Sequence, residues 1–116
     1  MHRRLRLRLT SDFQRLRQAG QTRNHPTMVF SYAQNNLEHN RYGFITPKRL
    51  GNAVKRNRIR RQVREAVRLL HPQLQQGYDI VVIVRVPLMG QPFQQIQRIV
   101  SELCDKAGLM LKEQKQ

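Results

Sequence analysis

The stretch KRNRIRRQVREAVR, from Lys55 to Arg68, predicts an amphipathic helix with an unusual distribution of charge. Apolar residues recur along it and just beyond it at the spacing of one helix face, namely Ile59, Val63, Ala66, Val67 and Leu70. The opposite face is expected to carry Asn57, Arg60, Arg61, Arg64 and Arg68. Like charges at helical spacing repel one another, so this face gives an isolated protein no stability. We therefore predict a helix that packs on a core and presents its arginines to a polyanion.

The composition of the whole chain also favours a nucleic-acid partner. Its 116 residues include 22 Lys and Arg against 7 Asp and Glu, a formal net charge of +15. Such a charge attracts phosphate from a distance, and planar guanidinium groups suit bidentate phosphate contacts. A solubilising surface or membrane adsorption is the alternative. A need for solubility alone would favour mixed or acidic charge. Adsorption to a membrane would favour an amphipathic segment rich in exposed aromatic residues, and the sequence has none. We therefore expect the partner to be a nucleic acid and not a membrane.

Chain length and cysteine content indicate one intracellular domain. A chain of this size can bury one small core. Cys104 is the only cysteine, so no intramolecular disulfide can form, which fits a cytoplasmic protein. No apolar run approaches the roughly 20 residues that cross a bilayer, and the N-terminal Arg-Leu alternation lacks the apolar segment of a signal peptide. We expect a single nucleic-acid-binding domain over residues 1–116, with a basic N-terminal segment at 1–10 and a flexible tail at 112–116.

The residues before the basic helix predict one helix and two strands. Ser11 and Gln14 form a capping-box pair that opens a short helix, and Gly20 ends it. Alternating apolar residues then predict strands at 27–33 and 42–46. An additional N-terminal strand over residues 4–9 is left open.

The basic helix and the residues after it complete a small α+β domain. Asn52 is a suitable N-cap for the basic helix, and His71-Pro72 ends it. The unbroken apolar run at 80–84 predicts a strand at the centre of the sheet, and helical spacing from Phe93 predicts a last helix. The expected fold is a single-domain sandwich of order α-β-β-α-β-α, with helices packed against a small central sheet.

The segment YGFITPKRLGNAVKRNRIRRQVREAVR, from Tyr42 to Arg68, resembles the signature of the bacterial ribonuclease P protein subunit. In that family a glycine-containing strand leads through a basic pair and a Gly-Asn-Ala-Val turn into an Arg-Asn-Arg helix. SDFQRLRQAG, from Ser11 to Gly20, resembles the family's first helix, and YDIVVIVR, from Tyr78 to Arg85, resembles its central strand. The resemblance covers nearly the whole chain in the expected order.

The resemblance implies a function and one detail of the fold. The family's protein binds the catalytic ribonuclease P RNA, and the complex removes the 5′ leader of precursor tRNA. The protein is then the accessory subunit of an endonuclease whose chemistry belongs to metal ions, Mg²⁺, held by the RNA. It needs no cofactor of its own and no obligate protein partner. The family also has a left-handed βαβ crossover around its basic helix, whereas right-handed crossovers are the rule.

Charge pattern and resemblance together assign the basic helix and the loop before it to the catalytic RNA. Arg56, Asn57 and Arg58 correspond to the family's Arg-Asn-Arg motif. Arginines on a helix face can hold RNA phosphates without reading sequence, and an asparagine can bond a base edge or a 2′-OH. Arg56 lies nearer the apolar face, so holding the 48–52 loop is its alternative role. The expected RNA-binding residues are Lys48, Arg49, Asn52, Lys55, Arg56, Asn57, Arg58, Arg60, Arg61, Arg64 and Arg68.

The resemblance further implies a cleft between the first helix and the sheet that receives the single-stranded leader. Single strands are usually held by aromatic stacking beside a basic groove, and Phe13 aligns with an aromatic of the family's cleft. One turn later the family often has a second aromatic, but this chain has Arg17, which predicts a cation on the leader phosphates. Phe30 and Tyr32 are further candidates, although core packing is the expected role of a Phe or Tyr in so small a core. We favour Tyr32 over Ser31 in the cleft, although a slip of one residue reverses the two faces.

Nothing in the sequence predicts a catalytic or metal site on the protein itself. The seven acidic residues are scattered without a pair at metal-ligand spacing, and the four histidines form no HxH or HxxxH pattern. Phosphate-binding glycine loops are absent from the sequence. Cys104 shares an apolar helix face with Val100 and Leu103, so we expect it in the core.

Two other functions remain open at this point. A basic ribosomal or general structured-RNA-binding protein would share the size, charge and fold type, but would not stimulate precursor cleavage. A DNA-binding transcription factor could place the basic helix in a major groove. It would need sequence-specific base contacts and usually a dimer interface, for which the sequence offers no spare apolar surface.

Overall fold

The computed structural model describes residues 3–7 and 10–111, except for the side chains of Arg3, Thr10 and Arg17. The predicted tail, 112–116, and part of the predicted N-terminal segment therefore lie outside the described residues. The helices are α1 (Thr10–Ala19), α2 (Ala53–Leu70) and α3 (Phe93–Lys106). The strands are β1 (Gln21–Asn24), β2 (Met28–Gln34), β3 (Arg41–Ile45) and β4 (Tyr78–Val84). Single 3₁₀ turns occur at Arg3–Leu5, Lys48–Leu50, His71–Gln73 and Val86–Leu88.

The strands form one mixed sheet in the order β1-β2-β4-β3. Strand β2 pairs antiparallel with β1 and β4, whereas β3 and β4 run parallel and are joined through α2. Strand β4 lies inside the sheet, and most of its side chains are buried. The prediction of a central strand from its unbroken apolar run is confirmed. The predicted left-handed crossover stays a prediction.

The order predicted from the sequence was one strand short, because β1 was missed. All four residues of β1 are exposed, so the strand carries no apolar pattern that could reveal it. Its pairing with β2 and the hydrogen bond from His25 N to Met28 O (3.0 Å) define it instead. The described residues of the 4–9 segment do not form a regular strand. Residues 3–5 form a 3₁₀ turn, Arg6 makes only an isolated bridge with Tyr42, and residues 8 and 9 lie outside the description.

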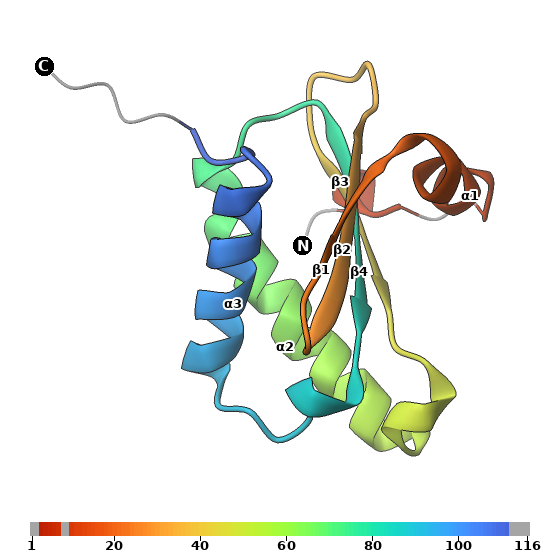
Figure 1. Cartoon of the computed structure of the whole chain (residues 1–116), viewed down its shortest axis with the longest axis vertical. Helices are drawn as coiled ribbons and strands as arrows, with labels where there is room; N and C mark the ends of the chain where they lie inside the picture. The colour runs from red at the N-terminus through yellow and green to blue at the C-terminus, as the bar shows by residue number, and fades with distance from the viewer. Residues whose placement is uncertain (1–2, 8–9, 112–116) are drawn as a thin grey trace, which may run out of the picture.

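Helices α2 and α3 cover one face of the sheet, and α1 lies on the other (Figure 1). The main core lies between the sheet and the helix pair, because alternate residues of each strand point to that face. Its largest buried side chains include Met28, Phe30, Tyr42, Ile80, Val82, Val63 and Ile96. The predicted apolar face of α2 is confirmed, with Ile59, Val63, Ala66 and Val67 buried. Asn52 is the N-cap, as predicted, and its Oδ1 accepts a hydrogen bond from Lys55 N (3.0 Å).

Cys104 also lies in the main core, as its position on an apolar helix face predicts. It is 2% exposed, and burial raises the pKa of its thiol to about 12. Such a thiol stays protonated at neutral pH and is a poor nucleophile. Within the described part of the chain, no helix combines the length and apolar character needed to cross a membrane.

A smaller apolar cluster joins α1 to the second face of the sheet. Leu7, Leu16 and Val81 are its buried members. Phe13, Ala33, Ile45 and Ile83 pack against them but stay partly exposed. This face is therefore covered only in part, and the sheet beside α1 is open.

Candidate nucleic-acid interface

Helix α2 and the turn before it form a basic surface, here called the α2 basic surface. Its exposed members are Lys48, Arg49, Asn52, Lys55, Asn57, Arg58, Arg61 and Arg68, and its half-buried members are Arg56, Arg60 and Arg64. Glu65 is the one acidic residue of α2, and it forms an ion pair with Arg68 (2.5 Å). For the other cations of the surface, the described residues offer no ion-pair partner. The structure thus brings all the RNA-binding residues predicted from the sequence onto one helix and its entry turn.

Burial and the repulsion of neighbouring cations both lower the pKa of Arg64. Partial burial lowers that pKa, and the nearby charges of Arg6, Arg60 and Arg61 lower it further. A phosphate placed among these groups would relieve the repulsion. Arg6 was not predicted as part of this surface. Its signal in the sequence was the alternation of arginine and leucine at the N-terminus.

Asn57 and Arg60 are already held in place within the surface. Arg60 Nη1 donates to Asn57 Oδ1 (3.0 Å), and its Nη2 donates to Thr46 Oγ1 at the end of β3. The amide nitrogen of Asn57 is left to donate to a ligand. Arg56 differs from its neighbours, since its Nε is buried and has no hydrogen-bond partner among the described residues. Its alternative role of holding the 48–52 loop stays a prediction.

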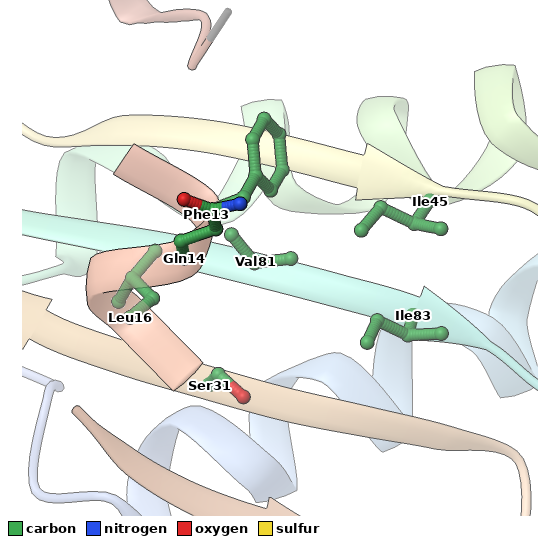
Figure 2. Close-up of a pocket in the computed structure, with 7 residues that line it drawn as sticks. All are labelled: Phe13, Gln14, Leu16, Ser31, Ile45, Val81 and Ile83. Carbon is green, nitrogen blue, oxygen red and sulfur yellow. The ribbon is translucent and has the colours of Figure 1, made fainter. Parts of the chain in front are cut away.

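A cleft opens where α1 crosses the second face of the sheet, and it is called the α1 cleft here. Its volume is about 230 Å³. The lining residues are Phe13, Gln14 and Leu16 from α1, with Ser31, Ile45, Val81 and Ile83 from the strands (Figure 2). Ile45 and Ile83 lie farther along β3 and β4 than the helix reaches. The α1 cleft is therefore apolar in its floor and open at the end away from α1.

The strand register arranges this face in three rows of residues. The rows are Arg41–Asp79–Ala33, Gly43–Val81–Ser31 and Ile45–Ile83–Val29. The first row carries charge, the second lies beneath Phe13, and the third is apolar and half-buried. A single-stranded segment entering from the open end would meet the apolar row first and the Phe13 ring next.

Phe30 and Tyr32 do not reach the α1 cleft. Both are buried in the main core on the other face, with ring centroids 5.8 Å apart. Tyr32 Oη also donates to Gln21 Oε1 (2.7 Å), which satisfies its hydroxyl. Ser31 lines the cleft instead, so the preference for Tyr32 at this position was wrong. The backbone of Arg17 belongs to α1, but its side chain lies outside the described residues.

The described chain contains no group of three or more His, Cys, Asp or Glu side chains that could hold a metal ion. The cleft itself presents no ionisable side chain among its lining residues. Its geometry suits the binding of an extended, partly apolar ligand.

Comparison with known proteins finds relatives over most of the chain. The family model described as Ribonuclease P matches residues 1–108. The ribonuclease P protein component of Roseiflexus sp. (strain RS-1) is 47% identical over 111 residues, which are 95% of this chain and 91% of that protein. The one from Chloroflexus aurantiacus is 43% identical and covers 95% of this chain and 82% of its own length.

Solved structures show the same fold. The RNase P protein of Staphylococcus aureus superposes with a TM-score of 0.84 at 30% identity, over 92% of this chain and 98% of that one. The RNase P protein of Thermotoga maritima superposes with a TM-score of 0.81 at 28% identity, over 87% of this chain and 96% of that one. The four-stranded arrangement with helices on both faces is therefore shared with these proteins.

Proposed function

Since this chain belongs to the ribonuclease P protein family, we propose that it uses two separate surfaces for two RNA ligands of that ribonucleoprotein. The chain is the protein component of ribonuclease P, an endonuclease that processes the 5′ leader of precursor tRNA. The family resemblance read from the sequence was correct. The two surfaces are the α2 basic surface and the α1 cleft, and the helices that carry them lie on opposite faces of the sheet (Figure 1).

The α2 basic surface binds ribonuclease P RNA in this proposal. Its support is the row of exposed arginines and lysines, nearly all without an acidic partner in the described chain, together with the lowered pKa of Arg64. A structured RNA supplies phosphates and 2′-hydroxyls at the spacing of such a helix face. Asn57, held by Arg60, is placed to add one directed hydrogen bond.

The α1 cleft binds the single-stranded leader. The observation that carries this assignment is the half-buried ring of Phe13 beside an uncovered apolar row of the sheet. A base stacked on an aromatic ring gains roughly 1–3 kcal/mol and needs no particular sequence. Ser31 supplies a hydroxyl in the cleft, and Arg17 is proposed to meet leader phosphates.

Catalysis is assigned to the RNA partner and to Mg²⁺ ions that it holds. The protein then contributes affinity, and needs neither a cofactor nor an obligate protein partner. A cytoplasmic site of action, one RNA-binding domain over residues 1–116 and a left-handed β3-α2-β4 crossover complete the proposal. The basic, ribosomal-type alternative would bind structured RNA without distinguishing precursor from mature tRNA.

Leader binding is tested by replacing Phe13 with alanine in the reconstituted ribonucleoprotein. Phe13→Ala should weaken binding of leader-bearing precursor by roughly 1–3 kcal/mol, while mature tRNA binds as before. The matched control is Phe93→Ala, which removes a partly buried ring that packs on the main core instead. It should lower stability and leave the preference for precursor unchanged. If Phe13→Ala lost the same affinity for precursor and for mature tRNA, Phe13 would not be part of the leader site.

A further inference from the structure

A buried ion cluster centred on Asp79 lies in the charged row beneath α1. The Asp79 side chain is 0% exposed. Its Oδ1 accepts hydrogen bonds from Arg41 Nε (2.9 Å) and Asn35 Nδ2 (2.9 Å). Its Oδ2 accepts from Arg41 Nη2 (2.8 Å) and Arg15 Nη2 (2.5 Å). Both carboxylate oxygens are thus fully used by groups from three other segments.

The cluster joins α1 to the sheet at two points. Arg15 of α1 reaches Asp79 on β4, and Arg41 of β3 reaches back to Asp12 of α1 (3.5 Å). Arg15 Nη1 also lies 3.4 Å from Gln34 O on β2. The hydrogen bonds to Asp79 raise the pKa of Arg41 despite its partial burial, so this guanidinium stays charged. Helix α1 is therefore tied to three adjacent strands by charged groups.

Stability alone does not account for such a cluster. Taking charges out of water is costly, and well-packed apolar residues at the same place often serve stability equally well or better. What directed, bidentate ion pairs add is a defined geometry. Here they act on the helix that carries the Phe13 ring, and Asp12 and Arg15 lie on either side of Phe13 in the sequence.

The other contacts that α1 makes with the sheet are mostly apolar. Among the described residues, the buried members of the apolar cluster at α1 are Leu16, Leu7 and Val81. Phe13 packs beside them, partly exposed, and lies against Gly43. Small apolar contacts are not directional, so a ten-residue helix held by them alone could rotate or slide. Any such movement would shift the Phe13 ring relative to the open apolar row.

We propose that the Arg15–Asp79–Arg41–Asp12 cluster is a positioning clamp that holds α1 over the sheet and thereby sets the opening of the α1 cleft for the leader. The clamp rests on the proposed leader site. Its residues do not themselves touch the leader. Arg15 and Asp79 act through the placement of Phe13.

The test compares Arg15→Gln, Arg15→Lys and Asp79→Asn in the reconstituted ribonucleoprotein, using precursor and mature tRNA. Arg15→Gln should reduce the preference for precursor by about 3- to 10-fold, because a displaced ring loses part of the stacking free energy of one base. Affinity for ribonuclease P RNA should not change. Arg15→Lys should restore part of the preference, since an ammonium can still meet Asp79 but cannot form the planar contact. Amide hydrogen exchange in α1, but not in α2 or α3, should become faster in Arg15→Gln.

Asp79→Asn distinguishes a clamp from a direct contact between Arg15 and the leader. If Arg15 bound leader phosphate itself, losing its acidic partner would free it and strengthen precursor binding. The clamp predicts weaker precursor binding instead. Asp105→Asn on the exposed side of α3 makes the same chemical change and the same change in net charge, and should have no effect on preference.

The outcomes also separate this inference from the leader site. If Phe13→Ala loses the precursor preference while Arg15→Gln and Asp79→Asn keep it, the clamp is wrong and the leader site stands. If Phe13→Ala keeps the preference, the leader site itself is wrong. Should Asp79→Asn fail to fold, hydrogen exchange in Arg15→Gln still decides, because losing a direct contact with the leader would leave exchange in α1 of the free protein unchanged. Arg41 retains its bidentate pair with Asp79 in that variant.

Discussion

The ring of Phe13 lies directly against the backbone of Gly43. A Cβ atom at position 43 would be 2.7 Å from Phe13 Cε1 and 2.8 Å from Cζ, closer than carbon atoms can approach. A glycine inside a strand costs roughly 0.5–1 kcal/mol relative to alanine, so its presence in β3 calls for a reason. The close approach of an aromatic ring supplies one. Gly43 forms the floor on which Phe13 rests.

Replacing Gly43 with alanine should therefore be harmful only while Phe13 is present. Gly43→Ala alone should lower the free energy of unfolding by about 1–3 kcal/mol, the usual range for an overpacked site. In a Phe13→Ala background the same change should be neutral or stabilising, because the clash is gone and strand propensity favours alanine. Urea unfolding of the four proteins in this double-mutant cycle measures the difference. Equal costs in both backgrounds would mean that the ring does not occupy the space above Gly43.

Removing cations from the α2 basic surface should change the salt dependence of RNA binding. Arg58→Ala with Arg61→Ala should leave the fold intact, since both side chains are exposed. Each lost phosphate contact should reduce the log–log slope of affinity against salt by roughly 0.7–0.9. The control is Arg98→Ala with Lys106→Ala, which removes two exposed cations from α3 instead. An unchanged slope in the α2 variant, or an equal change in both variants, would show that the exposed arginines of α2 do not contact the RNA.

The stability of the fold should fall in mildly acidic solution because of His71. Burial, assisted by the nearby charge of His39, lowers the pKa of His71 below its usual value of 6.5. Asn40 Nδ2 donates to Tyr42 Oη (3.1 Å), whose hydroxyl lies 2.7 Å from His71 Nδ1. Burial raises the pKa of Tyr42 to about 12, so the phenol stays neutral and can donate to an unprotonated His71 ring. A protonated ring could no longer accept that bond.

The sign of the pH effect follows from the lowered pKa. Below about pH 6.5 the unfolded chain binds more protons at this position than the folded protein does, so the free energy of unfolding decreases as pH falls toward the folded-state pKa. Above that range the contribution of His71 is constant. His71→Gln should make the loss of stability between pH 7.5 and pH 5.5 smaller, as followed by urea unfolding. If the free energy of unfolding fell equally in His71→Gln and in the parent protein, titratable groups other than His71 would be responsible for the decrease.

Much of the fold could be predicted from spacing alone, for identifiable reasons. Helix α2 has a full apolar stripe and an Asn52 N-cap, and β4 has an unbroken apolar run, so each carries its own signal. Strand β1 has none, since all its residues are exposed and its existence depends on pairing with β2. Tertiary pairing, and not local preference, forms that strand.

The candidate site was predictable in its types of residue and less so in its geometry. The cations of α2 were predicted to bind RNA because their spacing along the sequence places them on the helix face opposite the apolar stripe. The preference for Tyr32 over Ser31 in the cleft was wrong, because an aromatic residue of β2 could serve either a core or a cleft and only the register decides. The Asp79 cluster draws on segments from residue 12 to residue 79, so no local pattern indicates it.

Cleavage of precursor tRNA tests the central claim most directly. The assay combines a bacterial ribonuclease P RNA with precursor at low, near-physiological Mg²⁺, with and without this protein. We expect the protein to restore cleavage at the mature 5′ end, to show no activity by itself, and to lose much of its effect on precursor binding when Phe13 is alanine. Tight RNA binding without stimulation of cleavage, across several such RNAs, would contradict the account and favour a general RNA-binding protein.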